Sequence, residues 1–161
     1  MVRRDFEHFK STYLNGIPSG LSTTTFQQSV PVVNAYTIQY SNLVNNPLYN
    51  AETVSNETYL ITARLTNPNI FGLLTDSTTG RFTLLCNTSP SGNDPLALGV
   101  VSFKHANFNI TSNHISVIWN GSNIGSKFAY MGVIIYTDTP FTATAIPPPQ
   151  LTWEITVTKL A

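Results

Sequence analysis

The chain has 161 residues, close to the usual size of one domain, and its eight basic residues balance eight acidic ones. Charged residues make up only 10% of the chain, against roughly 25% in an ordinary globular protein. Hydroxyls and amides replace them, since the chain has 22 threonines, 16 asparagines and 14 serines. The zero net charge argues against a nucleic-acid partner, because nonspecific affinity for phosphate backbones comes from clustered Lys and Arg.

Residues 1–20 are predicted to form an N-terminal arm, and residues 21–161 a single domain. Phe6, Phe9 and Tyr13 stand at helical spacing within the arm, which is consistent with a short amphipathic helix or a segment that docks on a partner. We therefore predict these three aromatic residues as oligomer contacts.

After the arm the chain reads as strands separated by turns. Alternation of apolar and polar residues is clearest in 58–66 and 151–159, which indicates half-buried strands. The ten predicted strands are 30–40, 58–66, 69–74, 81–86, 97–104, 107–111, 114–119, 128–137, 141–145 and 151–159. Because no stretch after residue 14 is long and periodic enough for a crossover helix, we predict an all-β antiparallel sandwich or barrel.

The ionisable residues that catalysis or metal binding would need are spread thinly. His8, His105 and His114 show no metal-ligand spacing, and no nucleophile or phosphate-binding motif is present. The single cysteine, Cys86, excludes an internal disulfide and is interpreted as a small core residue on a strand. We predict no enzyme, metal or cofactor; catalysis would need a pocket that joins His105 or His114 to a carboxylate.

Trp119 and Asn120 form the candidate ligand site of the sequence. An aromatic ring can stack on a sugar while a neighbouring amide binds its hydroxyls. The alternative is that Trp119 ends a buried strand and packs beneath the following turn, whereas Trp153 alternates with Leu151 and Ile155 and is expected in the core. The longest nearly apolar run, 130–136, is far shorter than the roughly 20 residues that cross a bilayer, so no membrane span is expected.

The Thr- and Asn-rich strands, the hydrophobic strand at 128–137 and the closing strand at 151–160 together resemble the single jelly-roll proteins of non-enveloped viruses. These include coat proteins and protruding-spike or fibre-head domains. The resemblance implies a jelly-roll sandwich of about eight to ten strands. RNA-packaging shells of this kind usually have a strongly cationic N-terminus, which this chain lacks, and the difference favours a spike, minor capsid or accessory position.

The expected function is that of a structural virion protein, located in the virion, which assembles through its sheet faces and its N-terminal arm. Its partner is then a copy of itself, in a trimer or a larger homo-oligomer, since a surface low in charge causes little repulsion between copies. The alternative is a glycan- or receptor-binding β-sandwich module, lectin-like or of the fibre-head type, with an extracellular location.

Overall fold

The computed structural model describes residues 22–31, 37–38, 43–51, 56–67, 79–91, 93–104, 114–139 and 150–160. The predicted arm and the predicted strands at 69–74, 107–111 and 141–145 lie outside these ranges. The elements are β1 (Thr23–Pro31), β2 (Thr37–Ile38), β3 (Val44–Asn45), β4 (Thr58–Leu65), β5 (Thr79–Asn87), β6 (Leu96–Lys104), β7 (His114–Asn120), α2 (Gly121–Ile124), the 3-10 helix η7 (Gly125–Ala129), β8 (Tyr130–Thr137) and β9 (Gln150–Lys159).

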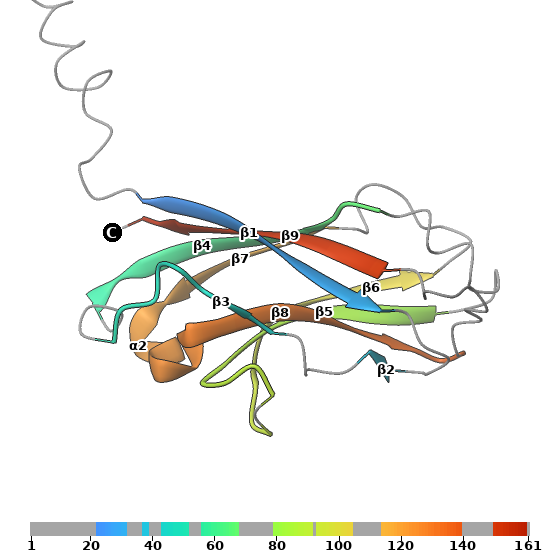
Figure 1. The fold of residues 1–161 in the computed structure, drawn as a ribbon. Coiled ribbons are helices and arrows are strands. Elements are labelled where there is room, and N and C mark those ends of the chain that lie inside the picture. Colours follow the sequence, from blue (N-terminus) through green and yellow to red (C-terminus); the bar gives the residue numbers. More distant parts are fainter. Residues whose placement is uncertain are drawn as a thin grey trace, which may run out of the picture.

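The strands form two sheets stacked in two layers, with α2 at one end (Figure 1). Sheet A has the order β1-β9-β4-β7, and sheet B has the order β2-β8-β5-β6 with β3 also paired to β8. The pairing is nested and antiparallel: β1 meets β9, β2 and β3 meet β8, β4 meets β7, and β5 meets β6. The first half of the chain thus pairs with the second half in reverse order, and the fold is an all-β sandwich of the jelly-roll type.

The core lies between the two sheets and is built by strands that alternate as predicted. On β4 the inward residues Tyr59, Ile61, Ala63 and Leu65 are buried, and on β9 Leu151, Trp153, Ile155 and Val157 are buried. Aromatic rings connect the layers, since Phe82 stacks on Phe103 at 4.7 Å between ring centroids and meets Trp153 edge-on at 4.9 Å. The core positions expected for Trp153, Leu151 and Ile155 are confirmed.

The predicted strand at 30–40 is wrong in its start, because β1 begins at Thr23; its residues 37–38 lie in β2, and 32–36 and 39–40 lie outside the described residues. Alternation is present earlier in the chain, where Phe26, Gln28 and Val30 point inward. It is inconspicuous in the sequence because Gln28 is polar and yet 1% exposed.

A short helix, α2, follows β7, and the strand expected to begin at Phe128 begins at Tyr130. Asn120 caps α2, because its backbone is extended and its side-chain oxygen accepts from the backbone N–H of Ser122 at 2.9 Å. Phe128 lies in η7 and is fully buried against the ring of Tyr59, with 4.4 Å between ring centroids.

Gln28 connects sheet A to the backbone of β8 in sheet B. Val133 lies between Met131, which pairs with β3, and Ile135, which pairs with β2. The side-chain oxygen of Gln28 accepts from the backbone N–H of Val133 at 2.7 Å, so this buried donor is satisfied. Gly132 makes room for it, because a Cβ there would lie 2.5 Å from the Gln28 amide nitrogen.

Replacing Gln28 by methionine, which is similar in size and apolar, is expected to lower the free energy of unfolding by about 1–3 kcal/mol, because the Val133 N–H loses its acceptor. The matched control is Gln27→Met on the exposed face of the same strand, expected to change stability by less than about 0.5 kcal/mol. Urea unfolding followed by tryptophan fluorescence measures both. Equal stabilities for the two variants would contradict the role assigned to Gln28.

Candidate functional site

Trp119 has a structural role at the open side of the sandwich. It lies on the inward face of β7, is partly buried and packs against the core. Its indole N–H donates to the carbonyl of Leu98 at 2.9 Å. Leu98 is the extra residue of a bulge, since Leu84 pairs with Gly99 and Leu85 pairs with Ala97. The indole therefore ties the edge of sheet A to the edge of sheet B.

Asn120 leaves β7 on the opposite face from Trp119, because successive side chains of a strand alternate. Its side-chain oxygen accepts both from the backbone N–H of Ser122 and from the Ser122 hydroxyl, the latter at 2.6 Å. The structure thus gives the two residues different neighbours and does not bring them together. A ligand-binding role for them stays a prediction.

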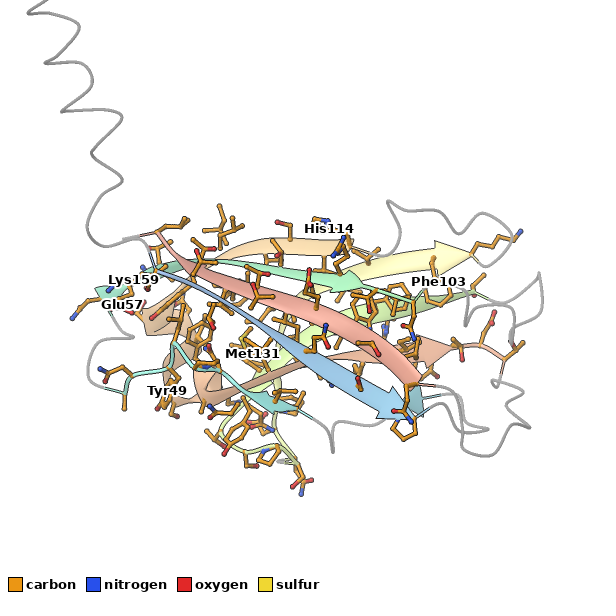
Figure 2. All side chains as sticks on the ribbon, turned by 45° about the horizontal axis from the view of Figure 1, so that its top comes forward. Tyr49, Glu57, Phe103, His114, Met131 and Lys159 are labelled. Carbon is orange, nitrogen blue, oxygen red and sulfur yellow. The ribbon has the colours of Figure 1, made fainter. Side chains whose placement is uncertain are left out.

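The other residues singled out by the sequence are distributed as follows. Phe6, Phe9, Tyr13 and His105 lie outside the described residues. His114 is exposed on the outer face of sheet A, opposite Arg64, whose guanidinium binds Glu154 at 3.0 Å (Figure 2). In the described part of the chain no three His, Cys, Asp or Glu side chains are grouped to hold a metal, and no helix is long and apolar enough to span a membrane.

Cys86 is fully buried in β5. Burial raises the pKa of its thiol to about 12, although the positive charge of Lys127 acts in the opposite direction. The thiol is therefore protonated at neutral pH and out of contact with solvent, as its interpretation as a core residue requires.

A buried polar cluster closes the end of the sandwich near α2. Glu57 accepts hydrogen bonds from the Tyr59 hydroxyl and from the Lys159 ammonium, and Figure 2 shows Glu57 and Lys159 side by side. Burial, followed by the hydrogen bond and the charge of Glu57, raises the pKa of Tyr59 far above its usual value. The phenol thus stays neutral and donates. The carboxylate therefore links Tyr59 of β4 to Lys159 of β9 at this end of sheet A.

The outer face of sheet A is a surface of aligned hydroxyls, which we name the hydroxyl face. It comprises Thr23, Thr25 and Ser29 of β1, Thr152, Thr156 and Thr158 of β9, Thr62 of β4 and Ser116 of β7. One register row contains only hydroxyls, from Thr25 through Thr156 and Thr62 to Ser116. Between β1 and β9 the opposed hydroxyls lie 3.0–3.2 Å apart in three pairs and bond to each other.

Two further rows complete this face. Thr23 and Thr158 continue across the sheet into Leu60 and Ile118, and Ile118 is 66% exposed. The charged row contains Arg64 and Glu154, which neutralise each other. The face is therefore nearly neutral, rich in groups that both donate and accept, and apolar at one margin.

A second surface feature lies at the end of sheet B where β5 begins and β8 ends. It is an open depression of about 710 Å³, within the range of small-molecule sites. Its lining includes Arg81, Ser102 and Tyr136, which are cross-strand neighbours in one row and share the outer face. Gly80 and Phe103 also line it, and a Cβ on Gly80 would be 2.7 Å from the ring of Phe103.

Charged groups frame this depression. The guanidinium of Arg81 lies over the ring of Tyr136, 5.2 Å from its centroid, and Tyr136 remains 47% exposed. The Asp138 carboxylate accepts from the backbone N–H of Thr79 at 2.9 Å and from its hydroxyl at 2.7 Å. These bonds, the hydroxyl bond first, lower the pKa of Asp138, so the carboxylate stays ionised. Sequence reasoning missed this site because its residues come from three strands and the segment after β8.

Neither a family model nor a curated protein matches the sequence. Among solved structures, the chain is similar to one in the crystal structure of tomato aspermy virus. The two share 14% identity at a TM-score of 0.45, over 99% of this chain and 94% of that chain. A likeness at this score supports no argument, and the jelly-roll assignment rests on the strand pairing.

The variant Trp119→Phe is expected to lower the free energy of unfolding by about 1 kcal/mol, because the ring still packs while the Leu98 carbonyl loses its donor. Trp119→Ala also loses the packed ring and is expected to cost about 3 kcal/mol or more. Denaturant titration with circular dichroism separates the two effects. If Trp119→Phe were as stable as the unmodified chain, the indole bond would have no part in joining the sheets.

Cys86 is expected to resist a disulfide reagent such as Ellman's reagent in native buffer at pH 8, and to react fully in concentrated urea. The liberated thionitrobenzoate is followed by absorbance, with free glutathione as the reactive control. Complete modification of the native protein within minutes would show that the thiol is accessible and would contradict its place in the core.

Proposed function

We propose that this chain is a structural protein of a virus particle, which assembles with copies of itself through the hydroxyl face. The main support for the proposal is that the outer face of sheet A is nearly neutral and presents ordered hydroxyls from four neighbouring strands. The jelly-roll fold accords with this role, although the same fold also serves lectins and cupins and does not decide function.

The chemistry of the hydroxyl face suits a second copy as its occupant. Each hydroxyl both donates and accepts a hydrogen bond, so the same surface on a copy always offers complementary groups. The net charge of the chain is zero, and the only charged pair in the central rows, Arg64 and Glu154, is already satisfied within one copy. Electrostatic repulsion therefore opposes this contact little.

Ile118 supplies the apolar part of the proposed contact. It is the most exposed of the large hydrophobic residues of the described chain, and Leu60 lies beside it on β4. Full burial of an isoleucine side chain contributes about 1.5–3 kcal/mol, which corresponds to at least a tenfold change in an association constant. The predicted contribution of the N-terminal arm, through Phe6, Phe9 and Tyr13, is part of the same proposal.

Glycan or receptor binding is the second candidate function. Trp119 and Asn120 give it little support because their polar groups are engaged within the chain. The observation that favours it is the depression at Tyr136, which is separate from the hydroxyl face and lies on the other sheet.

Analytical ultracentrifugation of the full chain at about 10 μM tests self-assembly. The unmodified chain is expected to sediment as a species larger than a monomer, and Ile118→Glu is expected to raise its dissociation constant at least tenfold, because an ionised group would be buried. A chain that stays strictly monomeric would exclude the proposal.

The matched control is Val100→Glu, because Val100 is similarly exposed, at 54%, but lies on the outer face of sheet B. It is expected to leave the oligomeric state unchanged while showing any general effect of an added carboxylate. If both variants dissociated the assembly equally, the contact would not be confined to the hydroxyl face.

A further inference from the structure

We propose that the depression between β5, β6 and β8 binds a carboxylated sugar, with Arg81 bound to the ligand carboxylate and Tyr136 packed against the sugar ring. This inference is independent of self-assembly, since it concerns the outer face of sheet B. The groups that would recognise such a ligand are already held in place by the sheet register and by contacts within the chain.

The positions of Arg81 and Tyr136 are fixed by the strands. They are direct cross-strand partners, so both side chains leave the sheet on the same side. The guanidinium rests over the phenol ring at 5.2 Å, which restrains a long side chain before any ligand arrives. Tyr136 nevertheless leaves about half of its surface exposed, and a sugar ring would pack against the part of the phenol that the guanidinium does not cover.

Arg81 has unused hydrogen-bonding capacity. The ion pairs of the described residues join Arg64 to Glu154, Lys127 to Asp94 and Lys159 to Glu57, and Arg81 takes part in none of them. A guanidinium offers five donors in a planar fork that matches a carboxylate. An anionic group on the ligand would therefore complete the coordination of Arg81.

Asp138 and the neighbouring hydroxyl groups would form hydrogen bonds with the hydroxyls of the sugar. Each Asp138 oxygen accepts one bond from Thr79, and a sugar hydroxyl would take the place of the weaker contacts that the exposed carboxylate makes with the backbone N–H groups of Asp138 and Thr139. The same bonds hold the carboxylate in a fixed position. Ser102, next to Arg81 in the row, adds a hydroxyl that both donates and accepts.

The balance of charge selects an acidic ligand over a neutral one. Lys104 is the exposed cross-strand partner of Thr79, so the described charges around the depression are the cations Arg81 and Lys104 and the anion Asp138. One negative charge on the ligand balances this set. A neutral sugar would leave the Arg81 guanidinium without an anion, and a dianion would meet the fixed Asp138 carboxylate.

Saturation-transfer difference NMR tests the proposal on the full chain, using the methyl glycosides of glucuronic acid and N-acetylneuraminic acid as probes. Each is compared with its methyl ester, which keeps the ring and removes the charge. Saturation transfer to at least one acid, weakened about tenfold or more in its ester, is the expected result. No transfer to either acid, or equal transfer to acid and ester, would overturn the proposal.

Variants assign the binding to this site. Arg81→Gln and Tyr136→Ala are each expected to weaken binding of the acid about tenfold or more, whereas Tyr136→Phe retains the ring and the binding. Arg64→Gln is the matched control, because it removes an arginine from the outer face of the other sheet. Circular dichroism shows which variants are folded, and full binding by folded Arg81→Gln would overturn the assignment.

The same NMR measurement works on a monomer or on a large assembly, so its outcome does not depend on self-association. An Ile118→Glu chain that is monomeric and still binds the acid would confirm that the two sites are separate. Loss of acid binding in that variant, with the fold intact, would contradict the placement of the ligand on sheet B alone.

Discussion

The alternation of inward and outward side chains along the strands of sheet A is the constraint on which the rest of the structure depends. Because successive side chains point to opposite faces, the register that buries Trp153 and Ile61 also places Thr156 and Thr62 on the outer face. A slip of one residue between β4 and β9 would put threonines in the core and the tryptophan in water. The core and the hydroxyl face are thus two results of one register.

Side chains from distant parts of the chain also form hydrogen bonds with backbone groups of the opposite sheet. The side-chain oxygen of Gln28 accepts from the backbone N–H of Val133 across the layers, and the indole N–H of Trp119 donates to the carbonyl of Leu98 at the bulge. A buried donor or acceptor without a partner costs about 1–3 kcal/mol, a large part of the net stability of a small domain. These contacts therefore help to fix how the two sheets are placed against each other.

The two outer faces have different chemistry, and this difference separates the two proposals. Sheet A presents many weak and equivalent groups, which suits an extended contact with an identical neighbour. Sheet B presents a cation, a fixed carboxylate and an aromatic ring around one depression, which suits a small and specific ligand. A single domain of this kind can assemble on one side and bind on the other, since neither function uses the residues of the other.

Period-two alternation was enough to predict the strands at 58–66 and 151–159, and the spacing of turn clusters was enough to predict those at 81–86, 97–104 and 114–119. The composition was enough to predict their neutral outer surface. Alternation did not reveal the start of β1, because a glutamine is expected on the surface unless its buried partner, Val133, is known. The sequence also suggested a candidate ligand site at Trp119, because this aromatic residue precedes the amide of Asn120.

The sequence by itself determined the class of fold and the character of the surface, because both follow from local patterns of neighbouring residues. Only the tertiary structure decided the nested strand order, the structural use of Trp119 and the meeting of Arg81 with Tyr136 and of Asp138 with Thr79. The physical reason is that these contacts join residues more than 20 positions apart. Such pairs are set by cross-strand register and by the closure of two sheets over one core, and neither is encoded in any short stretch of chain.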